Sequence, residues 1–490
     1  MKRLASVCAI AAGASLVFST TVFASTPSLV SGPSPYASCT ADARIGTNYV
    51  NAEVEPQAAV NPHNPRNIVG VWQQDRWSNG GAHGLVAGFS FDGGASWGET
   101  PLPFSVCAPN GAAYNRASDP WVSIGSDGTV YANAISFERS SNRNAVTAAT
   151  SSDGGRTWKN LRTLVAYEIN GGQFSTDKNS ITANPVQRGV AYSTWDTLIL
   201  ATDNPDDNPH TAAYMGPAFF SRTTDFGKTW SAPQTIFPTA ERNQTIGNII
   251  LVDPRNGANT LYDVTDWITQ PNSRSNTQES AAVVKSTDGG LTWGAPVVIA
   301  QMQTVGVHDP NTGQLIRVGD GIPEAAIDPQ TGQLYVVWEQ ASNFKRGNSK
   351  TSDDEVDIST SVDGGQTWSM PSVVNTFTGL PAFTPTVAVN AAGVVGVTYY
   401  DFRELTPTNT TTLPTDYWFT SSSDHGLMFG GEKQIAGPFD MLTAPYARGF
   451  FVGDYEALAT SGTSFIPFFV QANSGNTANR TDVFVTTIAS

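Results

Sequence analysis

The sequence predicts an all-β fold: a single β-propeller whose blades are four-stranded antiparallel sheets. Two observations support this prediction. An eight-residue pattern recurs five times, and an apolar strand–turn–strand pattern alternates with it. Gly, Pro, Ser, Thr and Asn are abundant, and helical periodicity is nearly absent. Short apolar runs bounded by turn residues are typical of strands, and the repeat of 60–73 residues suits blades with long loops.

The eight-residue pattern reads Ser-x-Asp-x-Gly-x-Thr-Trp. Its near-copies begin at Ser90, Ser151, Thr223, Ser286 and Ser361, and a degenerate sixth begins at Ser422. The aspartate is expected to bond backbone N–H groups two residues on. The glycine at the fifth position can take a positive φ, and the tryptophan is expected to pack between neighbouring sheets. Each copy therefore predicts a hairpin tip joining the third and fourth strands of a blade.

The apolar hairpins set the number of blades. Aligning their second strands gives seven anchors: Ile68, Val130, Val190, Leu261, Leu334, Val395 and Phe465. Seven hairpins against six boxes favour seven blades over six. The seventh unit has no box and ends with a strand-like stretch at 482–488, so residues 46–54 are expected to supply its outer strand. With no linker or composition break, residues 25–490 are predicted to form one domain.

The first 24 residues have the character of a secretory signal peptide. Lys2 and Arg3 precede an apolar run at 4–17, and small residues follow up to Ala24. The mature chain is therefore expected to be secreted or periplasmic, and no other stretch is long and apolar enough to cross a membrane. In an oxidising compartment Cys39 and Cys107 are expected to form a disulfide, with two free thiols as the alternative.

The chain is acidic, with a formal net charge of −15, or −17 without the two basic residues of the leader. Such a charge disfavours nucleic acid and anionic membranes as partners. An anionic ligand would have to meet a local cluster of Arg or Lys. A monomer is expected.

The eight-residue pattern is the Asp-box, and its copies resemble those of the sialidase-like β-propeller superfamily across essentially the whole mature chain. In that family the boxes lie on the face opposite the active site. Its catalytic members hold a substrate carboxylate with three arginines, and they use a Tyr nucleophile paired with a Glu and an Asp acid/base. The resemblance implies a secreted, sialidase-like glycoside hydrolase that acts on an acidic glycan.

Several residues match the family's positions. Tyr455, in the run Gly-Asp-Tyr-Glu, resembles the nucleophile that opens the first strand of the last blade. Arg76 ends the second strand of the first blade, where the family has an arginine, and Arg403 and Arg448 are further arginines by location. The family's Arg-Ile-Pro is absent, and Glu55-Pro-Gln stands in that region. A neutral Tyr nucleophile suits a substrate whose anomeric carbon bears a carboxylate.

The remaining candidates lie where strand ends meet the face opposite the boxes. Asp119 is the expected acid, and Glu339 or Glu324 the expected partner of Tyr455. Aromatic planes and charged groups on one face suit sugar binding. Further candidate substrate-binding residues on this face are Arg139, Asp196, Tyr400, Asp401 and Asp454.

Two other functions stay open. A polysaccharide lyase on the same scaffold would use a Tyr or His base, with His83 and His308 as candidates, and a propeller without catalysis would only bind glycans. The five histidines show no metal-ligand spacing, and no cofactor is expected. The acidic stretches at 203–207 and 353–357 could bind a structural Ca²⁺, although solvated loops are the commoner outcome.

Overall fold

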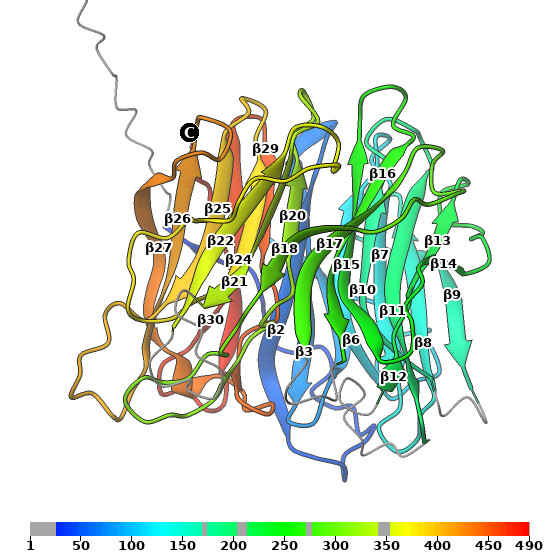
Figure 1. Cartoon of the computed structure of the whole chain (residues 1–490). Coiled ribbons are helices and arrows are strands. Elements are labelled where there is room, and N and C mark those ends of the chain that lie inside the picture. Colours follow the sequence, from blue (N-terminus) through cyan, green and yellow to red (C-terminus); the bar gives the residue numbers. More distant parts are fainter. Residues whose placement is uncertain (1–25, 169–173, 203–212, 271–276, 342–352, 490) are drawn as a thin grey trace, which may run out of the picture.

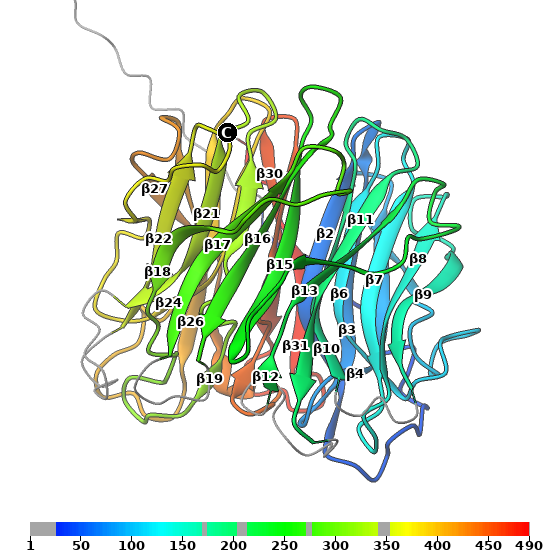
Figure 2. The same ribbon diagram turned by 45° about the vertical axis from the view of Figure 1, so that its right-hand side comes forward.

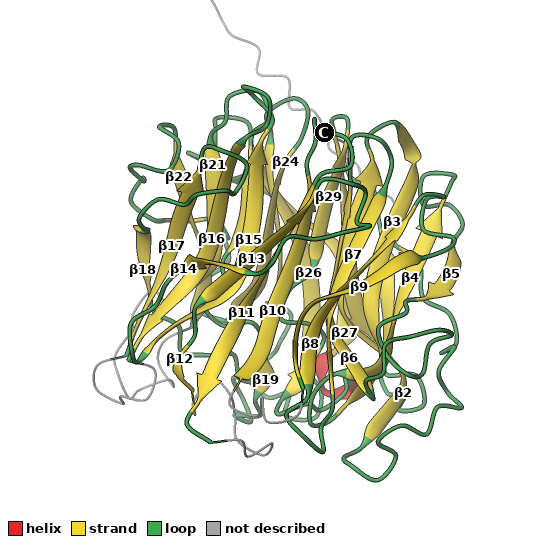
Figure 3. Ribbon diagram, turned by 90° about the vertical axis from the view of Figure 1, so that its right-hand side faces the viewer, coloured by secondary structure: helices red, strands yellow, loops and turns green. Residues whose placement is uncertain are grey.

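The fold consists almost entirely of β-strands, as predicted. The computed structural model describes residues 26–168, 174–202, 213–270, 277–341 and 353–489, so the signal peptide expected at 1–24 lies outside it. In this part of the chain the only helix is the short 3₁₀ turn η1 (Met441–Thr443) (Figure 3). The strands stand upright, side by side (Figure 1). None of the described helices is long and apolar enough to span a membrane.

Four-stranded antiparallel units repeat along the chain. In the first, β2 (Asn48–Asn61), β3 (Asn64–Trp77), β4 (Ala82–Ser90) and β5 (Gly98–Pro101) pair in chain order. The same order recurs in β6–β9 (Arg116–Ile124, Val130–Phe137, Asn144–Ser151, Lys159–Tyr167), in β10, β11, β13 and β14 (Phe174–Ala183, Ala191–Leu200, Ala218–Thr223, Gln234–Phe237), in β15–β18 (Asn243–Asp253, Thr260–Thr269, Gln278–Ser286, Val297–Met302), in β20–β23 (Glu324–Ile327, Leu334–Ala341, Asp354–Ser361, Ser372–Val373) and in β24–β27 (Ala382–Val389, Val395–Asp401, Pro414–Ser422, Gly430–Asp440). The short β12 (Ala213–Met215) pairs with β11.

The last unit takes a strand from the start of the described chain. It contains β29 (Ala457–Ser461), β30 (Ser464–Ala472) and β31 (Thr481–Val485), and β1 (Ser28–Leu29) pairs antiparallel with β31. The expectation that residues 46–54 supply this strand is wrong, because residues 48–54 belong to β2 of the first unit and meet β31 through a single parallel bridge. Figure 2 shows red β31 close to blue β2.

The first strands of successive units are neighbours. In order they are β2, β6, β10, β15, β20, β24 and β29, and β29 again lies against β2. The strands therefore close into a ring. A short parallel pair, β19 (Ile316–Arg317) with β28 (Phe450–Phe451), links the loop before β20 to the segment before β29.

The Asp-boxes form the expected turns between third and fourth strands, with one correction. Asp92 accepts from the backbone N–H and the hydroxyl of Ser96, four residues on rather than two (2.9 and 2.5 Å). Gly94 has a φ of 92°. The ring centroid of Trp97 is 5.7 Å from that of Phe468 in the last unit, so the tryptophan packs between sheets as predicted.

The segment between β1 and β2 is held to the rest of the fold by a disulfide and an ion pair. The predicted disulfide between Cys39 and Cys107 is present. Asp42 pairs with the buried Arg116 at 2.8 Å. Arg116 also donates to the side chain of Asn79 and to the carbonyl of Gly80, each at 2.7 Å. This segment therefore supports the loop that follows β3.

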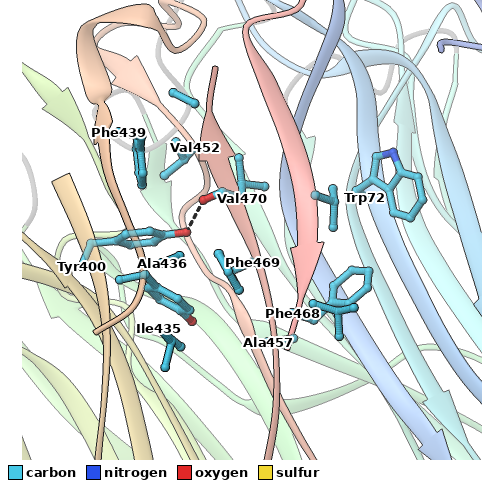
Figure 4. Close-up of a cluster of buried hydrophobic side chains, with 14 of the residues drawn as sticks. Trp72, Tyr400, Ile435, Ala436, Phe439, Val452, Ala457, Phe468, Phe469 and Val470 are labelled. Atoms are coloured by element: carbon cyan, nitrogen blue, oxygen red, sulfur yellow. Dashed lines mark hydrogen bonds between the residues drawn. The ribbon is translucent and has the colours of Figure 1, made fainter. Parts of the chain in front are cut away.

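The largest apolar core joins the β24–β27 unit, the last unit and the first unit. Trp72 of β3 lies near Phe468 of β30, with ring centroids 6.4 Å apart, and both side chains are fully buried. The hydroxyl of Tyr400 donates to the carbonyl of Val470 at 2.6 Å (Figure 4). Apolar packing and a buried hydrogen bond thus hold the last unit against its neighbours.

Candidate active site

A left-handed residue recurs at equivalent places in the first strands or just before them. These residues are Glu55 (φ 53°), Asp119 (53°), Lys178 (41°), Gly247 (74°), Asp320 (46°) and Thr384 (51°). The strand register shifts beside most of them, as expected for β-bulges. A non-glycine residue in this conformation costs about 1–3 kcal/mol, and such strain concentrates at functional sites. Five of these six positions are not glycine, and four of those five carry charged side chains.

A cavity of about 990 Å³ opens beside these bulges. Its charged lining includes Arg76, Asp119, Arg139, Lys178, Arg317, Asp320, Arg448 and Asp454. Residues from the loop after β3 and from the loop before β20 complete its walls. With Arg143, six Arg or Lys side chains line this one cavity, on a chain whose net charge is −15.

Three guanidinium groups converge on this cavity. The Cζ atoms of Arg76 and Arg317 lie 4.8 and 4.3 Å from the ring centroid of Phe451. Burial and the charge of Arg317 lower the pKa of Arg76 to about 10, and the same two causes lower the pKa of Arg448. The Nε of Arg76 is buried and has no hydrogen-bond partner among the described residues. Like charges held together in this way suit an anionic ligand.

Lys178 bridges the carboxyl groups of three other units. Its Nζ lies 2.6 Å from Asp454, 3.5 Å from Asp119 and 3.6 Å from Glu55. Burial alone would lower its pKa, but Asp454 and the other two carboxyl groups outweigh that effect and raise it. Burial likewise works against an ionised Asp454, yet Arg317 and Lys178 hold its pKa well below the usual range. Asp454 is therefore an ionised anchor for both cations.

Two other carboxyl groups in this set have raised pKa values, so that they take up protons near neutral pH. Burial, with the charge of Asp354, raises the pKa of Asp320 to about 7. Burial and the charge of Asp119 raise the pKa of Glu55 to about 8, although Lys178 opposes the shift. Asp320 lines the cavity. Its pKa is suited to proton transfer near neutral pH.

These shifts predict how stability depends on pH. Burial also raises the pKa of Glu324 to about 8. In the folded state Glu324, Glu55 and Asp320 therefore keep protons that the unfolded chain releases near pH 4. The folded state binds more protons, so stability falls as pH rises from about 4 through 8. We expect the Tm by calorimetry to be higher at pH 5 than at pH 8.

The matched variant is Glu324→Gln, which keeps the size of the side chain but has no proton to lose. It should reduce the fall in Tm between pH 5 and pH 8. A Tm that is flat or rises over this interval in the wild-type protein would contradict the assignment of these raised values.

The structure brings five of the expected catalytic and substrate-binding residues to the cavity. They are Arg76, Asp119, Arg139, Arg448 and Asp454. Their side chains come from the first and second units and from the segment before β29, which explains how residues far apart in sequence share one site.

Arg403, expected to bind substrate, lies elsewhere. Its guanidinium pairs with Asp401 at 2.6 Å and Glu432 at 3.0 Å and stacks over Trp418 at 3.5 Å. Tyr400 is buried in the core described above. Arg403, Tyr400 and Asp401 do not line the cavity. The charge of Arg403 is paired within its own unit.

Three further carboxyl groups do not line the cavity either. Asp196 accepts from the N–H of Gly247 and the hydroxyl of Thr245 in the next unit (3.1 and 2.8 Å). Glu339 likewise accepts from the N–H of Thr384 at 2.8 Å. Both support a neighbouring bulge, and Glu324 is also buried.

Tyr455 is buried and does not line the cavity. Its hydroxyl donates to the carbonyl of Pro120 at 3.2 Å, and Lys178 lies 5.5 Å from its ring centroid. Burial, then Glu55 and Asp119, raise its pKa well above the ordinary value. In the described part of the chain neither Glu339 nor Glu324 hydrogen-bonds Tyr455, although the charges of both Glu55 and Glu324 raise its pKa.

Sequence reasoning missed Arg317, and it placed Lys178 and Asp320 on this face without giving either a role. The available signal for Lys178 and Asp320 was their shared position at the start of first strands. Arg317 gave no local signal, since it reaches the cavity only through the parallel pairing of β19 with β28.

A metal site finds no support in the described part of the chain. No group of three or more His, Cys, Asp or Glu side chains there could hold an ion. Asp354, from the acidic stretch at 353–357, accepts from the N–H groups of Val305 and Gly306. The stretch at 203–207 falls outside the described residues. His308 lines the cavity, whereas His83 is buried against Asp75.

No protein-family model matches the sequence, and no curated protein matches it. Solved structures that it resembles include an α-L-arabinanase of Penicillium chrysogenum complexed with arabinobiose (13% identity, 94% of this chain and 98% of that chain, TM-score 0.47). A Hadza microbial sialidase (14%, 86% and 73%, 0.46) and a Trypanosoma rangeli sialidase in complex with sialic acid (14%, 76% and 54%, 0.41) also match. The neighbours are thus sialidases and arabinan-cleaving enzymes at low identity, too distant to carry an argument about the reaction.

Proposed function

We propose that this chain is a glycoside hydrolase of the sialidase-like type that cleaves an acidic sugar from a glycan. One observation carries the proposal: Arg76, Arg317 and Arg448 converge on a single cavity of an otherwise acidic protein. Guanidinium groups bind carboxylates in a bidentate way, so an acidic sugar would place its carboxylate there. Arg317 takes the place that the sequence had suggested for Arg403.

Asp320 and Asp119 are the proposed catalytic pair. Asp320 lines the cavity and is protonated below about pH 7, so it would donate a proton to the leaving oxygen as the glycosidic bond breaks. The Oδ2 of Asp119 has no hydrogen-bond partner among the described residues and lies 3.5 Å from Lys178. Asp119 would therefore act as the anionic partner, either attacking the anomeric carbon or activating water.

Tyr455 is the alternative nucleophile that the family resemblance implies. We favour Asp119, because the Tyr455 hydroxyl is bound to a backbone carbonyl, and burial together with nearby negative charge raises the pKa of Tyr455. Nucleophilic activation of a tyrosine would require the opposite shift.

We further propose a single ring of seven blades, closed by β1, in a monomeric protein that is exported after removal of residues 1–24. The circular order of the seven first strands supports the blade number. The disulfide between Cys39 and Cys107 fits an extracellular protein.

A panel of fluorogenic glycosides tests the reaction. It should contain an α-N-acetylneuraminide, a glucuronide and, as the neutral counterpart, an α-L-arabinofuranoside. Release from an acidic glycoside, with little from the neutral one, is the expected result. Preferential release from the arabinofuranoside would contradict the acidic substrate. An unsaturated product that absorbs in the ultraviolet, formed from a uronate polysaccharide, would indicate a lyase, and binding without any product would indicate a glycan-binding protein.

A further inference from the structure

Gln73 is a fully buried side chain with three polar partners. It lies on β3, three residues before Arg76. Its Oε1 accepts from Nη1 of Arg76 at 2.5 Å. Its Nε2 donates to Glu55 and, at 3.1 Å, to the hydroxyl oxygen of Ser118. The amide thus contacts an arginine of the cavity, the carboxyl group of the first bulge, and the strand that carries Asp119.

The direction of these hydrogen bonds is forced by chemistry. A guanidinium can only donate, so the amide oxygen of Gln73 must face Arg76 and its NH₂ group must face the other way. Ser118 accepts from that NH₂ group, and its own proton is directed to Oδ1 of Asp119 at 2.5 Å. The chain of donors therefore runs from Arg76 through Gln73 and Ser118 and ends on Asp119.

We propose that Gln73 and Ser118 are positioning residues that couple the anion-binding Arg76 to the Asp119 carboxylate. This inference rests on the proposed function, and it adds a link between substrate recognition and the anionic catalytic group. An acceptor that receives a short hydrogen bond is stabilised in its ionised form, and networks in a low-dielectric interior strengthen each link. A ligand carboxylate bound at Arg76 would change the charge at one end of this series of hydrogen bonds, whose other end is Asp119.

Other charged groups also face Asp119. Lys178 comes from β10, Glu55 and Arg76 from the first unit, Arg317 from β19, and Tyr455 from the segment before β29. Lys178 contacts the other oxygen, Oδ2, so removing the Ser118 hydroxyl leaves that contact in place. The effect of the Ser118 hydrogen bond on Asp119 can therefore be measured separately from the effect of Lys178.

Ser118→Ala is the direct test, because it removes one hydroxyl and little volume. We expect the acidic limb of the pH profile of kcat to move up by about one pH unit, so that kcat on the acid side of the limb falls by up to about tenfold with little change in KM. Gln73→Glu keeps an acceptor for Arg76 but removes the NH₂ donor, so the Ser118 hydroxyl can turn away from Asp119. It should move the limb in the same direction and at least as far.

The control is Ser123→Ala on the same strand, β6. Its hydroxyl oxygen accepts from the N–H of Ala183 and does not line the cavity, so the pH profile should not change. An acidic limb that stays in place in both Ser118→Ala and Gln73→Glu would overturn the coupling.

A second readout needs no substrate. Carbon-13 NMR of carboxyl-labelled aspartate, with the Asp119 signal assigned by its loss in Asp119→Asn, follows proton binding in the ligand-free protein. In Ser118→Ala the Asp119 carboxyl should keep its proton to higher pH than in the wild type. An unchanged titration would overturn the inference, whereas the expected change without turnover of any glycoside would leave the coupling standing and remove only the proposed reaction.

Discussion

Replacing Arg317 by methionine is expected to lower kcat/KM for an acidic glycoside by about 30- to 150-fold. Loss of a hydrogen-bonded charge pair with a ligand carboxylate costs about 2–3 kcal/mol, and each 1.36 kcal/mol corresponds to a factor of ten. Asp454 would keep its 2.6 Å contact with Lys178, so the variant does not leave that carboxylate without a partner. Arg317→Lys, which keeps the charge but not the planar fork, should lose less.

The matched control is Arg403→Met. Arg403 is also a paired, stacked arginine, but it does not line the cavity. This variant should lower Tm and leave kcat/KM unchanged in the protein that remains folded. Steady-state kinetics with an acidic and a neutral glycoside separates charge recognition from general damage. An equal loss on both glycosides in Arg317→Met would contradict the proposed role.

Asp320→Asn is expected to reduce kcat by about 10²- to 10⁴-fold on a glycoside with a poor leaving group, the range typical for loss of a general acid. A glycoside with a good leaving group needs less protonation and should suffer less. In the wild type, activity should fall as pH rises through about 7, where Asp320 loses its proton, and this basic limb should disappear in the variant.

Asp309→Asn provides the comparison for this experiment. Asp309 lies in the same loop and accepts from the backbone N–H groups of Asn311 and Thr312, and it does not line the cavity. It should retain both the wild-type rate and the basic limb. If the basic limb persists in Asp320→Asn, another group donates the proton.

The fold followed from the sequence because its signals are local. Each Asp-box is a closed turn within eight residues, and each hairpin pairs adjacent apolar strands. Pairing of Cys39 with Cys107 could be predicted because only these two cysteines follow the leader. The outer strand of the last unit was misplaced because Ser28–Leu29 pairs with a strand some 450 residues away, and no local pattern in two residues reports such a partner.

The sequence indicated which face of the propeller carries the candidate site, but it did not identify all the residues of that site. Arg76 and Asp119 were found because they sit at strand ends. Arg403 looked equivalent, yet Asp401 two residues earlier pairs with its charge. Arg317 lies in a loop that only tertiary pairing brings to the cavity. The bulges that aim Lys178 and Asp320 depend on left-handed backbone, which charged residues rarely adopt.

The pairing of β1 with β31 also constrains the order in which the chain can fold. The first unit can form its own hairpins early, but β31 remains an exposed edge until Ser28–Leu29 returns to it, and exposed edges recruit other chains. Contacts between residues so far apart in sequence are slow to form, because the entropy of closing the long loop is lost before the contact contributes any favourable energy. Assembly of this ring therefore finishes with a search between distant segments, during which aggregation competes with closure.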